Sequence, residues 1–524
     1  MAGKTMPEPG IASPLLPDHA VPEPGDVTKL GIDAMLQKFS GEFGIWQLRH
    51  FVLTSLAWAL EAFHTMVMIF ADREPGWRCT QLGSSSCGPT ICGSEPGSWE
   101  WIGGKGLSTV SEWGLVCSER YKVGLVQSGF FAGCLIGAGI FGHLSDSFLG
   151  RKGTLTTVCI LNGIMGLLTA ASPTYWVYLI LRFLTGVSTG GVGLSAFVLA
   201  TEPVGPGKRG VAGMSTFYFF SAGIAILSGI AYMFPSWRML YIITSIPSLL
   251  FVLSIIPNIH ESPRWYLVRG RPSDAMKIMR EIADRNRNHL PPGISLSLDD
   301  SSSSNVDRNE TEICPSGSAS GNLIDVIRSP ITRFRLFLMV IINFSCAVVY
   351  YGLNLNVVNL QTNIYLNVFL NSVVEMPAYT ITALLLATVG RRYLTMMTMC
   401  FSGLSCFAGC LALSKGYYYM VARMISGVMG IFGVAATFNL LFIYTAELFP
   451  TVVRNAALGC ATQAGQVGAI LAPLVVVSGS GVAFVAFGTC ATVGGLLAYY
   501  LPETLNQPLY DTMAGIESSV GGKV

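Results

Sequence analysis

The sequence predicts an all-α integral membrane protein in which twelve transmembrane helices form two pseudo-symmetric bundles of six. Only 12% of the 524 residues are charged, whereas 51% are hydrophobic. A soluble protein carries roughly 25% charged residues, so this chain has about half the charge needed to cover a water-facing surface. Twelve apolar stretches can each cross a bilayer, and several motifs occur once in each half of the chain. The net charge of +2 excludes a broad basic surface for nucleic acid.

Each apolar stretch is expected to be a helix, because none shows the alternation of a barrel strand and a helix satisfies its backbone groups internally. A crossing needs about 20 apolar residues. In the first half the spans cover about 50–71, 123–142, 153–171, 175–200, 211–233 and 238–257. In the second half they cover about 335–356, 364–388, 394–412, 418–445, 456–478 and 482–501.

Polar segments divide the chain around these spans. We expect a flexible tail at 1–48, a bundle at 49–260, a partly helical connection at 261–334, a second bundle at 335–501 and a tail at 502–524. Lys and Arg are concentrated in the connection 261–334 and in the short loops on the same side. Positive charge is retained on the cytoplasmic side of a membrane. Both termini are therefore expected in the cytoplasm, with the plasma membrane and the vacuolar membrane as alternatives.

The connection 72–121, on the opposite side, contains four cysteines: Cys79, Cys87, Cys92 and Cys117. Four cysteines in a polar non-cytoplasmic loop predict two disulfides, for which three pairings exist. A metal site is the alternative, but the spacing does not form paired C-x-x-C knuckles. Disulfides are therefore favoured, and no metal site is expected.

The two halves share four elements in the same order, at a spacing of about 240–245 residues. The pairs are Arg182-Phe-Leu-Thr-Gly186 with Arg423-Met-Ile-Ser-Gly427, Glu202 with Glu447, Gly150-Arg-Lys152 with Gly390-Arg-Arg392, and Glu261 with Glu503. Such a repeat predicts two homologous six-helix bundles.

Repeated charges near the same ends of the helices suggest a gate. Asp146, Glu202 and Glu447 can pair with Arg151, Arg209 or Arg454, or with helix termini. These pairs could hold the inner side closed in one state and separate in another. The alternative is that the charges only set the topology, and the two interpretations are compatible.

Two long connections, 72–121 and 261–334, are accompanied by a set of recognisable motifs. The motifs are Gln127-Ser-Gly-Phe-Phe-Ala-Gly133, Gly142-His-Leu-Ser-Asp146, Phe197-Val-Leu-Ala-Thr-Glu202, Glu261-Ser-Pro-Arg-Trp265, Tyr444-Thr-Ala-Glu-Leu-Phe-Pro-Thr451, Leu501-Pro-Glu-Thr504, Glu42-Phe-Gly-Ile-Trp-Gln-Leu48 and Ala59-Leu-Glu-Ala-Phe-His-Thr-Met66. The architecture resembles the major facilitator fold, and these motifs resemble its organic cation, anion and carnitine transporter branch. The resemblance covers about residues 40–510, and its details are most similar to the plant organic cation/carnitine transporters.

The sequence departs from the family pattern in three places. Ser147 stands where the family has a basic residue after Asp146, and the second copy, Ala387-Thr-Val-Gly390, lacks the Asp. The inner latch is therefore expected to be weaker or asymmetric. Gln466 occupies a position that is Asp in animal cation carriers and Arg in anion or carnitine carriers, so it supports neither class.

Ionisable residues at membrane depth are costly and are candidates for function. Those in the spans of this chain are Glu61, His64, Arg182, Glu375 and Arg423. Glu61 and His64 share one helical face. Either acid could attract an ammonium group or a proton, or could pair with an arginine to hold a bundle together. Met376-Pro377 is expected to break the helix beside Glu375, and local unwinding favours a binding site. The duplicated arginines suggest a structural or gating role.

Aromatic side chains form a second candidate set, because cation–π attraction tolerates many ammonium shapes. Packing against lipid or other helices is the alternative for any one ring. The rings are Trp58, Phe217, Tyr218, Tyr350, Tyr351 and Phe438. Polar groups expected beside them are Asn343, Asn439, Gln463 and Gln466.

These observations predict a secondary active or facilitative transporter of small organic cations or zwitterions (carnitine, choline-like compounds, polyamines or alkaloids), working by alternating access. Proton coupling through Glu61 or Glu375 is an alternative source of energy. A sugar or organic-anion carrier of the same fold and a non-transporting sensor remain alternatives. The chain carries no P-loop, metal-spaced His/Cys cluster or nucleophile elbow, so no enzyme activity and no cofactor are expected. We expect a monomer.

Overall fold

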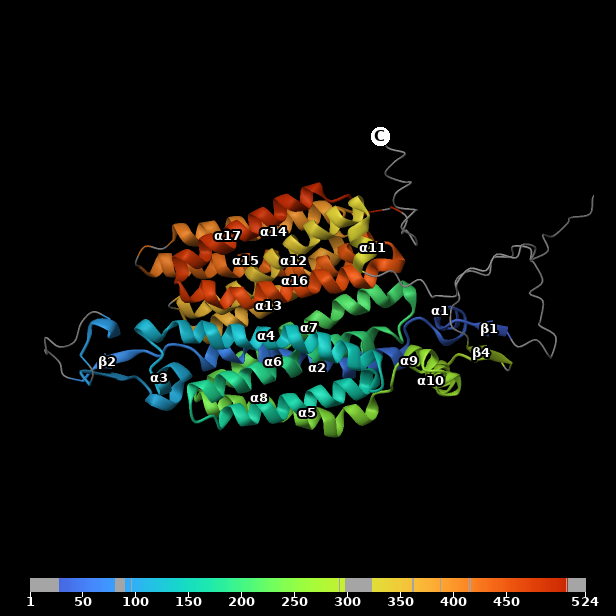
Figure 1. Ribbon diagram of the computed structural model, residues 1–524, viewed down its shortest axis with the longest axis horizontal. Coiled ribbons are helices and arrows are strands. Elements are labelled where there is room, and N and C mark those ends of the chain that lie inside the picture. Colours follow the sequence, from blue (N-terminus) through green and yellow to red (C-terminus); the bar gives the residue numbers. More distant parts are fainter. Residues whose placement is uncertain are drawn as a thin grey trace, which may run out of the picture.

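Twelve helices long and apolar enough to cross a membrane dominate the structure, and they fall into two bundles (Figure 1). The computed structural model describes residues 28–80, 90–296 and 323–507, apart from the single positions 96, 292, 361, 387, 413, 415 and 506. The connection after the first span lies at one end of the molecule, called here the cystine end. The connection between the bundles lies at the other, called here the basic end.

All twelve predicted spans are confirmed, and most begin a few residues earlier than their apolar core. The first bundle contains α2 (Ile45–Ala71), α4 (Tyr121–Asp146), α5 (Gly150–Ala170), α6 (Tyr175–Thr201), α7 (Pro206–Met233) and α8 (Trp237–Ser254). The second contains α12 (Pro330–Asn356), α13 (Ile364–Leu385), α14 (Arg391–Leu411), α15 (Tyr417–Leu448), α16 (Thr451–Val477) and α17 (Ser480–Leu497).

Glycines allow the helices to pack closely where the hydrophobic effect gives no force between them. Gly133 and Gly137 of α4 face the backbone of α6 so closely that a Cβ at either would overlap with it. Gly186 and Gly190 of α6 face α4 in the same way. This pair of helices is thus fixed backbone to backbone.

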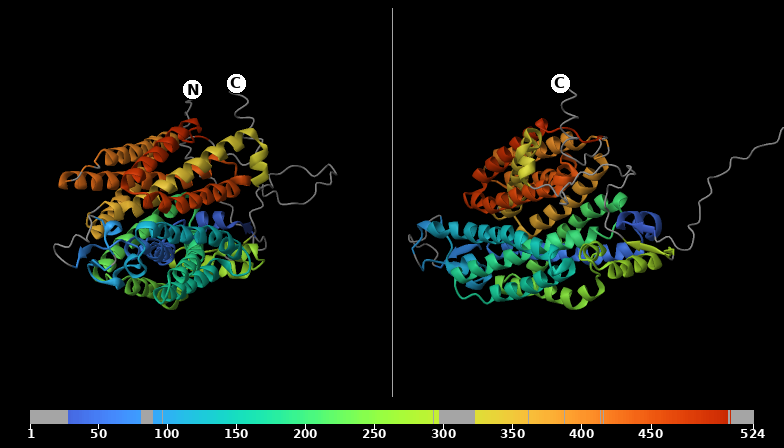
Figure 2. Two further views of the ribbon diagram at one scale, coloured as in Figure 1. Left: turned by 60° about the vertical axis from the view of Figure 1, so that its left-hand side comes forward. Right: turned by 45° about the vertical axis from the view of Figure 1, so that its right-hand side comes forward.

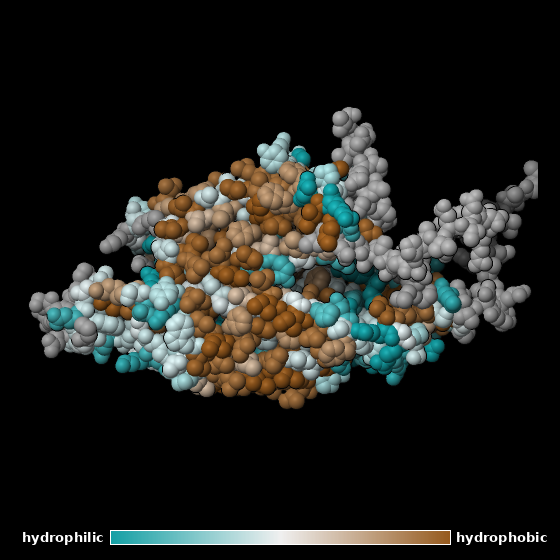
Figure 3. Space-filling view, in the orientation of Figure 1, coloured by the Kyte–Doolittle hydropathy of each residue, from teal (hydrophilic) through white to brown (hydrophobic). Residues whose placement is uncertain are grey.

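On the face shown in Figure 3, an apolar belt crosses both bundles between two polar ends. Large aliphatic side chains project outward from it, among them Leu253, Leu384 and Leu404, each about 70% exposed. A water-soluble surface would not tolerate so many, whereas hydrocarbon does. The belt therefore marks the lipid-facing part of the chain.

A small domain forms the cystine end. It contains β2 (Trp77–Cys79) antiparallel to β3 (Trp99–Trp101), α3 (Thr109–Trp113) and short 3-10 helices at Ile91–Gly93, Lys105–Leu107 and Cys117–Glu119. It is anchored to α8 by Glu112, which accepts hydrogen bonds from Trp237 Nε1 (2.7 Å) and Arg238 Nη2 (2.5 Å).

The expected disulfide chemistry is found in this domain. Cys92 is bonded to Cys117, and Cys79 is also disulfide-bonded. Cys87 lies outside the described residues. The sequence left three pairings of the four cysteines open. The bond between Cys92 and Cys117 establishes one of the two expected disulfides.

A second small domain forms the basic end, and it changes the expected boundary of the tail. β1 (Thr28–Leu30) pairs in parallel with β4 (Ile294–Leu296). Ile32, Met35 and Leu36 are buried together with Met279 and Ile282. The domain also contains α1 (Ile32–Met35), a π-helix at Leu36–Ser40, α9 (Pro263–Val268) and α10 (Pro272–Arg285). Outside it, α11 (Leu323–Arg328) packs on α12 and α16 of the second bundle, and 3-10 helices at Ile256–Asn258, Val357–Asn359 and Ala498–Tyr500 follow α8, α12 and α17.

Residues 28–48, expected to belong to a flexible tail, are therefore folded. The prolines that predicted a tail all precede residue 26, and the apolar residues that follow them pack on α10. Residues 1–27 and 508–524, the remainder of the two expected tails, lie outside the described residues, as does 297–322 of the central connection. The views in Figure 2 show this domain beside the first bundle only.

Peptide mapping under non-reducing conditions tests the disulfides. We expect a linked peptide pair that contains Cys92 and Cys117, and no free thiol at Cys79. Free thiols at both Cys92 and Cys117 in the native protein would contradict the structure.

Candidate functional site

The two bundles meet along α4 with α16 and along α7 with α13. At the cystine end, Arg73 Nη1 donates to the Tyr365 hydroxyl (2.5 Å), and Ser128 Oγ donates to the carbonyl of Ile470 (2.7 Å). All hydrogen bonds between the bundles that join described residues lie at this end or at mid-depth. The structure is therefore closed at the cystine end.

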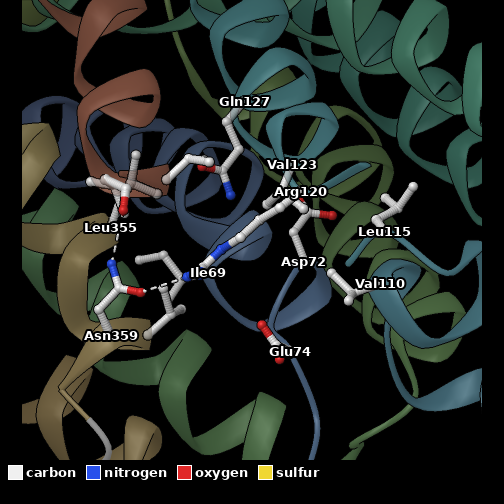
Figure 4. A pocket seen from close by; sticks show the side chains of 13 residues that line it. Ile69, Asp72, Glu74, Val110, Leu115, Arg120, Val123, Gln127, Leu355 and Asn359 are labelled. Carbon is white, nitrogen blue, oxygen red and sulfur yellow. Dashed lines mark hydrogen bonds between the residues drawn. The ribbon is translucent and has the colours of Figure 1, made fainter. Parts of the chain in front are cut away.

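A pocket opens at this closed end, with walls from both bundles (Figure 4). Arg120 crosses it and donates to Asn359 (3.2 Å). Asp72, beside it, accepts from Thr109 (2.8 Å) and Tyr178 (2.7 Å) through one carboxylate oxygen. Burial raises the pKa of Asp72 although these hydroxyls oppose the shift. This carboxylate joins the cystine-end domain to α6.

At mid-depth, Glu375 of α13 contacts the other bundle. Its side chain is fully buried. Its Oε2 accepts from Ser221 Oγ of α7 and from the Tyr379 hydroxyl (3.2 Å), whereas its Oε1 has no hydrogen-bond partner. Tyr218 bonds to Thr380 (2.6 Å) one turn further along. Glu375 forms no ion pair with any described residue, so it is not neutralised by an arginine.

The expectation that Pro377 breaks the helix beside Glu375 is wrong. α13 continues from Ile364 to Leu385 through the proline. Proline removes one backbone hydrogen bond, but neighbouring helices and small local adjustments satisfy the freed group in a membrane bundle. The position of Glu375 therefore depends on its contacts across the interface and not on unwound backbone.

The acid of the first bundle, Glu61, is only partly buried. Its Oε2 has no hydrogen-bond partner and lies against Gly193 of α6, where a Cβ would overlap with it. Trp58, one turn earlier, contacts Phe217 (5.2 Å between centroids) and lies on the same side. Gly193 thus provides the space that the carboxylate occupies.

His64 does not join Glu61, although we expected the two to share a face. Its Nε2 lies 3.1 Å from Ser248 Oγ, inside the first bundle. Arg182 is fully buried nearby, donates to the His64 carbonyl (3.1 Å) and lies over the Phe130 ring (4.2 Å). This placement fits the structural role expected for the arginine, and we leave His64 out of the proposed pocket.

The predicted aromatic residues come together from both bundles. Phe217 of α7 lies 6.4 Å from Phe438 of α15, and Tyr350 lies 5.2 Å from Phe438 and from Tyr351. We call this group the aromatic cluster: Trp58, Phe131, Phe217, Tyr218, Tyr350, Tyr351, Tyr379, Phe438 and Phe442. Tyr379 donates to Glu375 (3.2 Å) and contacts Phe217 and Tyr218, so the buried acid borders the cluster.

The four polar side chains expected beside the rings differ in burial and in hydrogen bonding. Asn343 donates to the Met339 carbonyl of its own helix (2.8 Å). Asn439 is 1% exposed and neither end of its amide has a partner. Gln463 and Gln466 on α16 are half-buried. A buried amide without a partner is costly, and Asn439 is the one residue of these four in that condition.

Ion pairs at the basic end differ between the two repeats. Arg151 pairs with Asp146 (3.0 Å) and Glu202 (3.4 Å). Arg391 pairs with Glu447 alone (2.8 Å). The expected asymmetry is therefore present: the second repeat lacks the aspartate but holds its remaining pair more closely.

Arg209 has a partner that the sequence did not indicate. Arg209 pairs with Asp33 (2.7 Å) and not with Glu202. Asp33 also pairs with Arg264. Arg264 and Arg209 hold the pKa of Asp33 below its usual value although burial opposes them. Asp33 was not identified because residues 28–48 were assigned to a tail. Arg454 lies in the first turn of α16. Arg423 of α15 is 8% exposed and forms no ion pair with a described residue.

Two glutamates missed as site residues cap the third helix of each bundle. Glu261 accepts from the backbone N–H groups of Arg151 (3.1 Å) and Lys152 (3.0 Å) at the start of α5. Glu503 accepts from those of Arg391 (2.8 Å) and Arg392 (3.1 Å) at the start of α14. A carboxylate is favoured at a helix N-terminus. Their equivalent positions in the two halves of the chain were the sequence signal that could have identified Glu261 and Glu503.

Comparisons with known proteins agree with this architecture. Residues 98–514 match the family model "Sugar (and other) transporter". Organic cation/carnitine transporter 4 of Arabidopsis thaliana is 63% identical over 94% of this chain and 92% of that protein. The chain belongs to the organic cation/carnitine transporter family of the major facilitator superfamily. The organic cation transporter protein of Drosophila melanogaster is 33% identical over 90% of the chain and 92% of its own length.

The fold agrees with a solved member of the superfamily. The xylose transporter XylE of E. coli, in a partially occluded inward-open conformation, aligns with a TM-score of 0.62. The alignment covers 88% of this chain and all of XylE at 16% identity. At this identity the similarity extends to the fold only.

The two capping glutamates predict a pH-dependent difference between the bundles. Burial raises the pKa of Glu261. Burial acts on Glu503 in the same direction, but its four backbone N–H donors prevail and hold its pKa below the usual value. As the pH falls, Glu261 is therefore protonated first, and the capping by Glu503 persists until the pH passes its lowered pKa.

Hydrogen exchange, corrected for the intrinsic pH dependence, measures this difference. On acidification we expect the amides of Arg151 and Lys152 to lose protection at a higher pH than those of Arg391 and Arg392. Simultaneous loss, or earlier loss in the second bundle, would contradict the assignment.

Proposed function

We propose that this protein is a secondary active or facilitative transporter that moves small organic cations or zwitterions across a membrane by alternating access. The single observation that carries the proposal is Glu375, a buried carboxylate without a paired cation, at the interface of the two bundles and beside the aromatic cluster. An isolated carboxylate in a low-dielectric site is strongly unfavourable. A bound ammonium group or a proton would relieve this cost.

The cluster suits such a substrate. Each ring face can add about 0.5–2 kcal/mol of cation–π attraction in a desolvated pocket without demanding one particular shape. Relatives named organic cation/carnitine and organic cation transporters support the same substrate class.

The proposal includes an orientation. The basic end, with the Lys- and Arg-rich segments, is placed in the cytoplasm together with both termini. The cystine end then faces outside or the vacuolar lumen, where disulfides are stable. Bundle contacts at the cystine end and separate ion pairs within each bundle at the basic end support an inward-facing state, and we propose that the protein works as a monomer. In the opposite state the inner ends would close.

The membrane potential can drive such a substrate. A cation that enters a compartment at −100 mV gains about 2.3 kcal/mol per charge, enough for roughly fiftyfold accumulation. Protonation of Glu375 or Glu61 offers a second source of energy, since either acid could exchange a proton for the substrate.

Replacement of the buried acid tests the proposal. In proteoliposomes with an inside-negative potential, Glu375→Gln should reduce uptake of a radiolabelled monovalent organic cation by about tenfold or more, because a charged hydrogen-bond partner is worth about 1.5–3 kcal/mol. Glu119→Gln is the matched control, because this partly exposed acid lies just before α4, outside the aromatic cluster, and pairs with Lys122. Unchanged uptake by Glu375→Gln would contradict the site, and wild-type uptake of sugars alone would contradict the substrate class.

The same vesicles test proton coupling. If Glu375 carries the proton, the pH dependence of uptake should disappear in Glu375→Gln. Residual uptake that keeps the wild-type pH profile would exclude Glu375 as the proton carrier.

A further inference from the structure

The connection after the first span forms the domain at the cystine end, and this domain is attached to the first bundle. Glu112 accepts hydrogen bonds from Trp237 (2.7 Å) and Arg238 (2.5 Å) at the start of α8. Thr109 donates to Asp72 (2.8 Å) at the end of α2. The domain is therefore fixed to one bundle, and the site at mid-depth gives it no role.

Two arginines, one near each end of this connection, reach across to the second bundle. Arg73 Nη1 donates to the Tyr365 hydroxyl at the start of α13 (2.5 Å), and its guanidinium lies 5.3 Å from the centre of the same ring. Arg120 Nη2 donates to Asn359 Oδ1 (3.2 Å), in the 3-10 helix after α12. Asn359 in turn donates to the Val476 carbonyl near the end of α16 (3.0 Å). The arginines thus connect the domain to the ends of three helices of the second bundle.

Arg73 completes a set of contacts around Tyr365. Phe70 of α2 stacks on the Tyr365 ring (5.6 Å between centroids), and Tyr232 of α7 packs against it at a steep angle (5.5 Å). Ser228 of α7 donates to the Tyr365 carbonyl (2.6 Å). A guanidinium near an aromatic ring adds cation–π attraction to its hydrogen bond. Arg73 thus supplies the one charged group among these contacts.

The pocket at the cystine end separates the domain from the second bundle (Figure 4). Its walls include Val110 and Leu115 of the domain and Leu355 of α12. Arg120 crosses this pocket to reach its partner. A long side chain that spans a pocket can release and rebind by rotation about its own bonds, whereas close-packed helices must repack. Such a contact is suited to a connection that opens and closes.

A disulfide restricts the segment from which Arg120 projects. Cys117, which is bonded to Cys92, begins the 3-10 helix Cys117–Glu119 directly before Arg120. The Cys117 carbonyl accepts a hydrogen bond from the backbone N–H of Arg120 (3.4 Å). The disulfide therefore fixes the backbone at the base of the Arg120 side chain.

We propose that the domain is a latch for the cystine end: Arg73 and Arg120 hold the two bundles together there, and the disulfide Cys92–Cys117 positions Arg120. The latch sets how readily this end opens. Neither arginine contacts the site at mid-depth, so both act as positioning residues through the placement of the bundles. The inference rests on the alternating access of the proposed function, but not on the identity of the substrate.

Distances between spin labels at the cystine end test the latch. Labels on Thr174→Cys, between α5 and α6, and on Ser478→Cys, after α16, report the separation of the two bundles. The protein is held in lipid nanodiscs without substrate. Every version carries alanine at the half-buried free cysteines, which are Cys400, Cys410, Cys460 and Cys490. We expect a predominant short distance when both arginines are present, with a minor population at a longer distance.

Replacement of the arginines should enlarge the long-distance population. Arg73→Gln should raise the ratio of long to short distances about tenfold, because it removes a hydrogen bond from a charged donor. Arg120→Gln should raise it about threefold, because Arg120 is exposed and bonds a neutral amide. The two effects should multiply in the double variant, since the contacts are separate. Arg78→Gln is the matched control and should leave the ratio unchanged, because this exposed arginine pairs with Glu100 inside the same domain.

Joint replacement of the two cysteines, Cys92→Ser with Cys117→Ser, tests the positioning of Arg120. We expect a rise of about threefold, as for Arg120→Gln, and no further rise when the two changes are combined. A rise that multiplies with that of Arg120→Gln would overturn the positioning role of the disulfide. Thermal unfolding identifies a misfolded variant, and the arginine variants, which keep the disulfide, then decide the proposal.

The outcomes separate this inference from the proposed function. Unchanged distances in folded Arg73→Gln and Arg120→Gln overturn the latch and leave the proposed function intact. A long distance in most wild-type molecules overturns the latch as well. Absence of organic-cation uptake by the wild type overturns the proposed function, whereas the distances need no substrate and still decide the latch.

Discussion

An ionised carboxylate needs a partner when it lies in the middle of a membrane protein, and this requirement organises the centre of the molecule. Glu375 finds two hydroxyl donors, one of them Ser221 from the opposite bundle, but no cation. Hydroxyl groups stabilise a negative charge only in part. The contact between α7 and α13 is therefore incomplete at its deepest point. An interface of this kind can separate and close again around a ligand that supplies the missing positive charge. A fully apolar interface would gain no such interaction by opening.

The remaining charges are satisfied within single bundles. Glu261 and Glu503 cap α5 and α14, and Arg151 and Arg391 pair with acids of their own repeats. Arg182 is held inside the first bundle by a backbone carbonyl and an aromatic ring. These contacts make each bundle a rigid unit without binding one bundle to the other at the basic end. Structural charges and the proposed site are thus separated: the former lie inside the bundles and the latter lies between them.

Much of this arrangement could be predicted from sequence, because membrane spans and internal repeats leave strong signals. The twelve helices, the asymmetric inner charges and the six rings of the predicted set follow from hydropathy, motif spacing and the rarity of Glu375 in a span. Partners from distant segments could not be predicted. Ser221 is one hydroxyl among many, and nothing in its neighbourhood indicates an acid 154 residues away. Asp33 stood in a segment that looked like a tail, and His64 has the right spacing from Glu61 but turns toward Ser248.

A structure of the protein in lipid nanodiscs with an organic cation bound tests the central claim most directly. Ligand density should lie among Trp58, Phe217, Tyr350 and Phe438, with its ammonium group beside Glu375 in place of the Ser221 contact. The helices at the basic end should be closer together than in the ligand-free protein. Density outside the aromatic cluster, or a Glu375–Ser221 contact that remains intact with the cation bound elsewhere, would contradict the account.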